Sequence, residues 1–145
     1  MRRATLDDVA TVTALTRAAY ARWVPVIGRE PLPMQADHAQ AIARHLIDIL
    51  DLNGPVALVE MIPHPDHLWI ENVAVHPDHQ GHGHGRRLIG HAEAVARSLN
   101  LRELRLLTNA AFTANLAFYA GLGFVETARM PFKGGFTVYF SKTLA

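Results

Sequence analysis

The sequence predicts an α/β (α+β) fold in which helices cover both faces of a mixed, mostly antiparallel central sheet. Three observations lead to this prediction. Asn53-Gly54 stands between two apolar runs, which is the strongest short-range signal of a β-hairpin. The segment 88–99 carries an apolar stripe with helical period, and strand-like runs precede and follow it. A strand on each side of a helix implies a parallel β-α-β crossover inside the sheet.

The amino-terminal part of the chain is predicted to be helical. Thr5 and Asp8 form the acidic variant of a capping box, and apolar residues then recur at helical spacing to about Trp23. Three prolines and one glycine in the segment 25–33 break this helix, because proline removes a backbone donor and clashes with the preceding turn. A second helix is expected around residues 36–44.

The rest of the chain alternates between strands and helices. The predicted hairpin leads through a proline-containing turn into an apolar strand over residues 68–75, so three consecutive strands form an antiparallel meander. The helix over 88–99 follows, and Gly121 and Gly123 stop a later, shorter helix. The remaining expected elements are a first strand at 2–4, a strand at 103–108, the short helix within 115–124 and a final strand at 136–144.

Composition excludes several classes of function. The 145 residues suffice for a single domain with a real core, expected to span 1–145. Hydrophobic residues make up 50% of the chain and the formal net charge is +1, which argues against a nucleic-acid binder held by a basic surface. Cysteine is absent, which excludes thiolate metal ligands and a cysteine nucleophile. With neither an apolar signal core nor a membrane-spanning run, a soluble cytoplasmic protein is expected.

The run VAVHPDHQGHGHGRRL, residues 73–88, places three glycines between a predicted strand and a predicted helix. Backbone amides and a helix amino terminus at such a junction make an anion site. A dinucleotide-binding fingerprint requires glycine where Arg86 stands, and a P-loop requires Lys and then Ser or Thr where Arg86 and Arg87 stand. Both of these nucleotide-binding motifs are therefore excluded.

Another pattern does match this run. Gln80, Gly83 and Gly85 have the spacing Q-x-x-G-x-G, after a strand that ends in AVHP and before an amphipathic helix. In this context the segment resembles the loop that binds the acyl-CoA pyrophosphate in the GNAT N-acetyltransferases.

A second motif strengthens the resemblance. Asn115, the aromatic pair Phe118-Tyr119 and the pair Gly123-Phe124 are similar to the other signature of that family, and the expected order of elements is similar over nearly the whole chain. The resemblance implies a GNAT-like fold and an acetyl-CoA-dependent N-acetyltransferase. Such an enzyme moves an acetyl group to the primary amine of a small molecule or a peptide by direct attack in a ternary complex.

The resemblance also assigns residues to acetyl-CoA. Backbone N–H groups from Gly81 to Arg86 and the dipole of the following helix would bind the pyrophosphate without a metal. The backbone near Val73 to Val75 would splay from its neighbouring strand and donate an N–H to the thioester oxygen. The residues expected to bind acetyl-CoA are Val73, Val75, Gln80, Gly81, His82, Gly83, His84, Gly85, Arg86, Asn109 and Asn115.

Catalysis requires a neutral amine, whereas an alkylamine with a pKa of about 10 is protonated at neutral pH. Glu71 is predicted to be the general base, directly or through water, because a carboxylate inside an apolar strand is costly unless it is used or paired. Glu60 is the second candidate. The resemblance identifies Tyr119 as the acid that protonates the departing thiolate. The alternatives are a paired or solvent-facing carboxylate for Glu71 and core packing for Tyr119.

Trp23, Arg29 and Glu30 lie in the proline-broken region that covers the acceptor cleft in such folds. They are the predicted substrate contacts, with packing as the alternative for Trp23. Histidines crowd the segment 64–84, but no HExxH pattern occurs, and alternate histidines on a tight turn are poorly placed for tetrahedral zinc. No metal cofactor is therefore expected.

Two other functions stay open beside the predicted acetyltransferase. An acyl-CoA-binding sensor or partner module without turnover would share the glycine-rich loop but would not need Glu71 and Tyr119. A histidine-rich metal-binding protein would bind zinc tightly and would have no affinity for coenzyme A. The exposed edge of the final strand also offers two copies a surface on which to pair as a homodimer.

Overall fold

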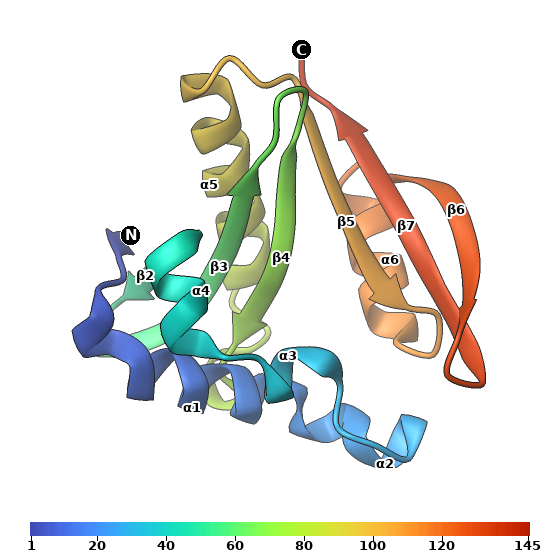
Figure 1. Cartoon of the computed structure of the whole chain (residues 1–145), viewed down its shortest axis with the longest axis horizontal. Coiled ribbons are helices and arrows are strands. Elements are labelled where there is room, and N and C mark those ends of the chain that lie inside the picture. Colours follow the sequence, from blue (N-terminus) through green and yellow to red (C-terminus); the bar gives the residue numbers. More distant parts are fainter.

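The computed structural model describes residues 1–145 and contains one seven-stranded sheet with the order β1-β2-β3-β4-β5-β7-β6 (Figure 1). Strands β4 and β5 pair in parallel, and the other neighbouring strands pair antiparallel. The predicted mixed, mostly antiparallel sheet with one crossover is therefore confirmed. The strands are β1 (Arg2–Arg3), β2 (Leu46–Asp51), β3 (Pro55–Pro63), β4 (Leu68–Val75), β5 (Glu103–Asn109), β6 (Val125–Phe132) and β7 (Gly135–Thr143).

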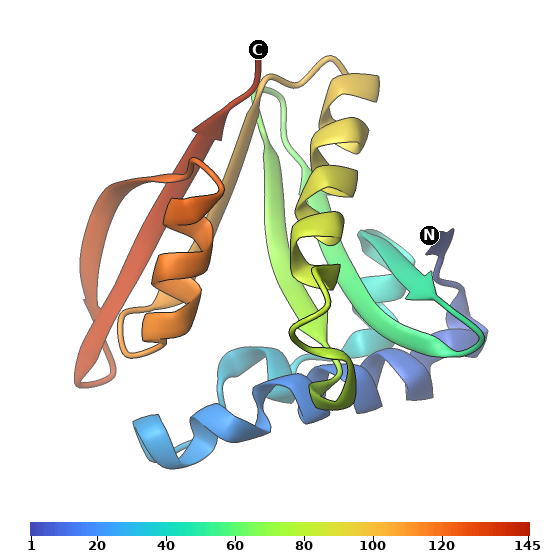
Figure 2. The same ribbon diagram turned by 180° about the vertical axis from the view of Figure 1, so that it is seen from behind.

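Helices cover both faces of this sheet, as predicted. Helices α1 and α4 lie on one face, and α5 and α6 lie on the other (Figures 1 and 2). The larger core, with 19 buried residues, lies under α5 and α6, whereas the core under α1 and α4 has 8. No helix is both long and apolar enough to cross a bilayer. The helices are α1 (Val9–Tyr20), α2 (Val24–Ile27), α3 (Leu32–Gln35), α4 (His38–Arg44), α5 (His84–Ser98) and α6 (Thr113–Gly121).

The amino-terminal region follows the prediction except around its prolines. The Thr5 backbone N–H donates to the Asp8 carboxylate at 2.8 Å, which confirms the capping box. The helical path continues through a 3-10 turn into α2 despite Pro25, because proline is tolerated in the first turn of a helix. It ends at Gly28, which has a left-handed φ of 72°. The short helix α3, also with a proline in its first turn, was not predicted.

The central meander confirms the predicted hairpin and turn. Asn53 and Gly54 have φ values of 59° and 133°, the left-handed backbone that asparagine and glycine adopt most readily, and they join β2 to β3. The chain turns again before β4, which pairs with β3. A bulge interrupts this second pairing: Glu60 opposes Asn72 while Met61 opposes Ile70, so Glu71 is the extra residue on β4.

Strand β6 was not predicted, and its position corrects one expectation. It forms the edge of the sheet and pairs only with β7, so seven of its eight residues are exposed and no apolar alternation marks it in the sequence. The final strand β7 therefore lies inside the sheet between β5 and β6, and it offers no free edge for a second copy. The free edge at this end of the sheet belongs to β6.

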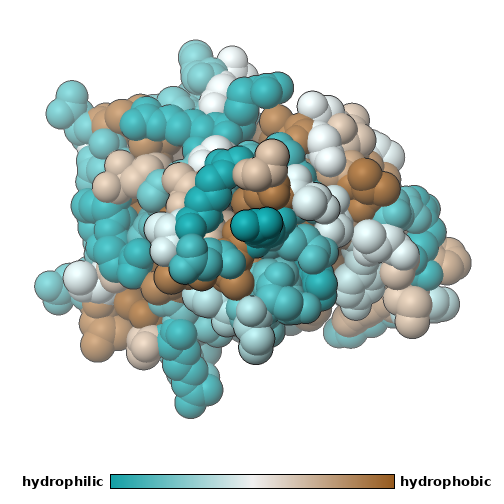
Figure 3. Space-filling model, turned by 90° about the horizontal axis from the view of Figure 1, so that it is seen from above, coloured by the Kyte–Doolittle hydropathy of each residue, from teal (hydrophilic) through white to brown (hydrophobic).

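The parallel strands β4 and β5 separate soon after they start. They pair at Leu68 with Leu104 and at Trp69 with Arg105, and no pairing follows further along (Figure 1). The splay that was expected near Val73 to Val75 is therefore present. On the face of the molecule drawn in Figure 3, hydrophobic residues lie in small groups among hydrophilic ones.

Candidate active site

Two cavities meet where β4 and β5 separate. The larger cavity, of about 530 Å³, lies between the segment α2 to α4 on one side and strands β3, β4 and β5 on the other. The glycine-loop cavity, of about 370 Å³, lies between the end of α1, strand β4, the loop before α5 and helix α6. Tyr20, the last residue of α1, lines both cavities, so they are neighbours across a single side chain.

The loop before α5 has the backbone of an anion site. Gly81 and Gly83 have φ values of 81° and 79°, a left-handed conformation that side chains disfavour. The first backbone hydrogen bond of α5 runs from the Arg87 N–H to the Gly83 carbonyl oxygen at 3.1 Å, so the N–H groups just before it have no helical partner. Gly85 is needed for packing, because a Cβ there would lie 3.0 Å from the Phe118 ring.

Most of the residues predicted to bind the coenzyme line this glycine-loop cavity together. His82 and Asn109 do not: His82 lines neither cavity, and Asn109 lines the larger one. Sequence reasoning missed His79 and Arg22, which also line it. The predicted residues that it brings together are Val73, Val75, Gln80, Gly81, Gly83, His84, Gly85, Arg86, Asn115 and Tyr119.

Tyr119 combines packing with access to the cavity. Its ring makes edge contacts with Phe118 and Phe124, at centroid distances of 5.1 and 5.5 Å, and only 8% of the residue is exposed. Burial raises the pKa of its phenol, so the group keeps its proton at neutral pH. The two readings of Tyr119 are thus compatible, because its ring belongs to the core while the residue lines the glycine-loop cavity.

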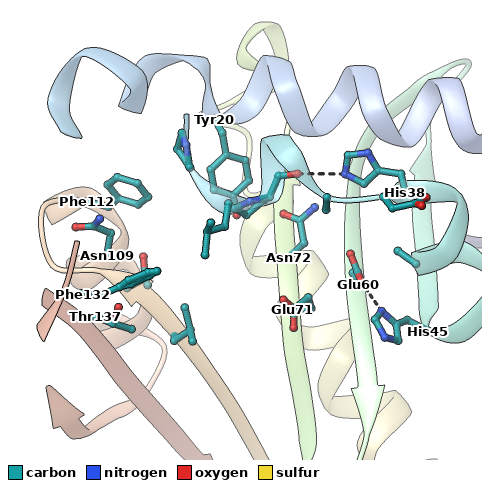
Figure 4. Close-up of a pocket in the computed structure, with 18 of the residues that line it drawn as sticks. Tyr20, His38, His45, Glu60, Glu71, Asn72, Asn109, Phe112, Phe132 and Thr137 are labelled. Carbon is teal, nitrogen blue, oxygen red and sulfur yellow. Dashed lines mark hydrogen bonds and ion pairs between the residues drawn. The ribbon is translucent and has the colours of Figure 1, made fainter. Parts of the chain in front are cut away.

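A carboxylate and a histidine form a hydrogen-bonded pair in the larger cavity (Figure 4). Glu60 on β3 is 4% exposed, and its Oε2 lies 2.6 Å from Nδ1 of His45, the residue just before β2. Burial raises the pKa of the Glu60 carboxyl, and the hydrogen bond with His45 opposes that rise. A carboxylate that is both desolvated and hydrogen-bonded to histidine is typical of a proton-transfer site.

Glu71 also lines the larger cavity, but its environment corrects the reason for which it was chosen. The residue is exposed, and its carboxylate accepts a hydrogen bond from Nε1–H of Trp69 at 2.8 Å. It is therefore a solvent-facing residue and not a buried acid inside an apolar strand. The buried acid of the meander is Glu60, which the sequence placed second.

Asn72 leaves one polar atom without a partner in the protein. Its Nδ2 donates to Oγ1 of Thr16 on α1 at 3.1 Å, but its buried Oδ1 accepts no hydrogen bond. The residue is 4% exposed and lines the larger cavity. A buried acceptor without a donor costs free energy unless something supplies the donor, and here that atom belongs to a residue that lines a cavity.

The three residues predicted to contact the substrate lie in three different surroundings. Arg29 lines the larger cavity, and its guanidinium lies 5.7 Å from the centre of the Phe132 ring. Trp23 lines the glycine-loop cavity instead and stacks on Phe112 at 4.5 Å, so packing accounts for it. Glu30 lines neither cavity and pairs with Arg17 at 2.6 Å. Of the three, only Arg29 lines the larger cavity.

Tyr20 is another residue that sequence reasoning missed, and it lies between the two cavities. Burial raises the pKa of its phenol. The hydrogen bond from the Val73 backbone N–H has the opposite, smaller effect, because it favours the charged form. That amide belongs to the stretch of β4 that has no partner on β5. The available signal was its spacing: Tyr20 follows Thr16 and Val12 at intervals of four, which places it on the helix face that meets the sheet.

The histidines near the glycine loop form contacts in pairs. The ring centroids of His79 and His84 lie 6.4 Å apart, and those of His82 and His84 lie 6.0 Å apart. His76 accepts a hydrogen bond from the Asp78 backbone N–H at 3.1 Å, so it caps the short 3-10 turn there. No group of three or more His, Asp or Glu side chains is arranged to hold a metal ion.

The family model of the GNAT acetyltransferases matches residues 12–124. This match covers most of the chain, and the chain therefore belongs to the GNAT family of acetyltransferases. The seven-stranded fold with its splayed β4 and β5 is the fold of that family, as the structural comparisons also indicate.

Individual relatives match the chain over different lengths, and the structural matches are longer than the sequence match. The chain is 38% identical over 65 residues to the L-amino acid N-acyltransferase MnaT of Escherichia coli K12, an alignment that covers 45% of this chain and 38% of MnaT. The PaiA N-acetyltransferase of Thermoplasma acidophilum, solved with coenzyme A, superposes with a TM-score of 0.81 at 16% identity over 98% and 96% of the two chains. A GNAT acetyltransferase of Elizabethkingia anophelis with acetyl-CoA bound gives 0.64 at 18% identity over 72% and 80%.

Proposed function

We propose that the protein is an acetyl-CoA-dependent N-acetyltransferase that moves an acetyl group to the primary amine of a small molecule or peptide by direct attack. The observation that carries the proposal is the meeting of two different cavities at Tyr20. One has the free amides and glycines suited to a pyrophosphate, and the other has the carboxylates suited to an amine. A thioester and an amine bound in these cavities would meet where β4 and β5 separate.

Coenzyme binding is assigned to the glycine-loop cavity. The amides near Gly83 and Gly85, together with the positive end of the fifteen-residue helix α5, favour an anion there. Arg86 adds a positive charge to the cavity lining, and the Gln80 side chain donates to the Val75 carbonyl oxygen at 3.2 Å, which ties the loop to β4. The unpaired stretch of β4 offers N–H groups to the thioester oxygen. The related structures with coenzyme A or acetyl-CoA support this assignment.

Tyr119 is the proposed acid for the leaving thiolate. It lines the glycine-loop cavity with Val73 and Val75, and its raised pKa keeps the proton available until the thiolate forms. Glu71 and Glu60 both line the acceptor side, where a proton must be removed from the amine. The presence of an acid on one side and carboxylates on the other favours turnover over coenzyme binding alone.

Arg29 favours an acceptor that carries a carboxylate, such as an amino acid. Its half-buried guanidinium lines the larger cavity, and its hydrogen bond reaches only the Glu30 carbonyl oxygen at 3.4 Å. The neighbouring Glu30 carboxylate is taken by Arg17. A half-buried cation with no carboxylate partner suits a bidentate anionic ligand. The similarity to an L-amino acid N-acyltransferase supports the same class of acceptor.

The test of the proposed function is calorimetric titration of the metal-free protein with acetyl-CoA, followed by a panel of amines scored for free thiol. The panel pairs amino acids with their amides and includes simple alkylamines and peptides. Binding followed by thiol release with at least one amine supports the proposal. Binding without release from any amine would leave a coenzyme-binding module, and no binding would remove the assignment of the glycine loop.

A further inference from the structure

His45 and Glu60 have a fixed relationship that determines which ring nitrogen is free. The contact of 2.6 Å joins Glu60 Oε2 to Nδ1, and a carboxylate can only accept, so Nδ1 carries the hydrogen. The neutral ring then has its lone pair on Nε2, for which no protein partner is found. The His45 side chain is 28% exposed and lines the larger cavity, whereas its partner carboxylate is 6% exposed. The buried acid therefore orients a histidine that solvent and ligands can reach.

We propose that His45 is the group that takes the proton from the acceptor amine, and that Glu60 positions it. The proposal rests on the proposed acetyltransferase function and concerns the same site. In this arrangement a buried carboxylate holds the base, because its hydrogen bond to Nδ1 fixes the orientation and the tautomer of the ring. Asn72, the register partner of Glu60, lines the same cavity, and its side-chain N–H donates to Thr16, which holds α1 against this part of β4.

Glu71 is less suited to this role. Its carboxylate is already engaged by Trp69, and because the residue is exposed, water stabilises its charge. The other titratable and charged groups that line the same cavity near His45 are Asp37, His38 and Arg44 on or beside α4. His38 contacts Thr13 and the Pro33 carbonyl oxygen through its two ring nitrogens, at 3.0 and 3.2 Å, so its lone pair is not free for an amine.

An ammonium group bound in the larger cavity gives one proton to Nε2 of His45 and becomes a neutral amine. Its nitrogen forms a bond to the acetyl carbonyl carbon, the carbon–sulfur bond breaks, and the electron pair of that bond leaves on sulfur. The second amine proton is lost as the amide forms, and the thiolate takes one proton from Tyr119, which is restored from that second proton. His45 releases its proton to water through its exposed edge.

The experiment begins with the ring itself and needs no turnover. Nitrogen-15 spectra of the histidine side chains in the wild-type protein should show His45 with its hydrogen on Nδ1, and Glu60→Gln should alter that signal more than any other histidine signal. A His45 that carries its hydrogen on Nε2 would overturn the proposal. This measurement is informative even if no acceptor amine has been found, so it separates this proposal from the proposed function.

Kinetics with an amine that the wild-type protein acetylates supply the second part. His45→Gln should lower kcat about 100-fold and remove the rise of rate with pH. Glu60→Gln should lower kcat about tenfold and leave the KM for the amine within about a factor of two, because only the orientation of the base is lost. His64→Gln, in the exposed turn before β4, is the matched control and should behave as wild type. Loss of the pH dependence in Glu71→Gln, with His45→Gln unaffected, would assign the base to Glu71. Absence of thiol release from the wild-type protein itself would contradict the proposed function instead.

Discussion

Glu60 on β3 lies directly opposite Asn72 on β4, and the next pair along the ladder is Met61 with Ile70, so Glu71 has no partner between them. A bulge of this kind re-aims side chains. It lets Glu60, Glu71 and Asn72 all line the larger cavity, although a regular strand would turn Glu71 and Asn72 to opposite faces. The polar lining of the larger cavity therefore depends on one inserted residue.

Coenzyme affinity should depend on the absence of charge at Gly83. Gly83→Glu adds a carboxylate beside the amides proposed to bind the pyrophosphate, and like charges in contact cost several kcal/mol, so binding should weaken about 100-fold or more. Calorimetric titration with acetyl-CoA measures the effect. Gly83→Ala isolates the strain of a side chain at φ 79°, and Gly90→Glu, on the exposed side of α5, isolates the added charge. Unchanged binding by Gly83→Glu would place the pyrophosphate elsewhere.

Tyr119 should matter more for turnover than for binding. Tyr119→Phe keeps the ring that packs on Phe118 and Phe124 but removes the proton offered to the thiolate. We expect kcat to fall by about 10- to 100-fold and the KM for acetyl-CoA to stay within about a factor of two. Steady-state kinetics measure both. An unaltered kcat would leave Tyr119 as a packing residue, and Tyr139→Phe on β7 serves as the matched control.

Arg29 should select acceptors that carry a carboxylate. For an amino acid, Arg29→Gln should raise the KM about tenfold, because a charge-assisted bidentate pair is lost. For the corresponding amide the same change should have little effect. The comparison of the two acceptors is therefore the measurement, with Arg102→Gln, outside both cavities, as the control. A tenfold effect in Arg44→Gln and none in Arg29→Gln would move the carboxylate to the α4 end of the cavity.

Asp48 should be important for stability and not for catalysis. It is 4% exposed on β2, and its carboxylate joins Arg3 on β1 to Nε2 of His91 on α5, the latter at 2.7 Å. Asp48→Ala should lower the free energy of unfolding by about 2 kcal/mol, less than for a fully buried pair because both partners can be hydrated once they are released. Urea unfolding measures this change.

The matched control for that prediction is Glu126→Ala. Glu126 is the exposed partner of Arg129 on β6, and an exposed ion pair contributes at most about 1 kcal/mol. Equal losses for the two variants would show that the link between β1, β2 and α5 adds nothing beyond a surface pair.

Several elements could be predicted because their causes are local. The hairpin depends on the backbone preferences of Asn53 and Gly54, and the start of the first helix depends on Thr5 and Asp8. The glycine loop was identified from its resemblance to a family motif, and the structure gives Gly81 and Gly83 the left-handed backbone that favours glycine. Strand β6 was missed, because an edge strand exposed on both sides has no apolar period to detect.

The sequence by itself determined the fold class, the family and the glycine loop for which coenzyme binding is proposed, since periodicity, turn residues and short motifs all lie along the chain. Only the tertiary structure decided which acid is buried, which cavity each predicted residue lines, and which strand forms the edge. Glu60 and Glu71 look alike in the sequence, and they differ because a bulge and the packing of His45 bury one and expose the other. Contacts between distant segments set desolvation, and desolvation decides which polar groups are available for chemistry.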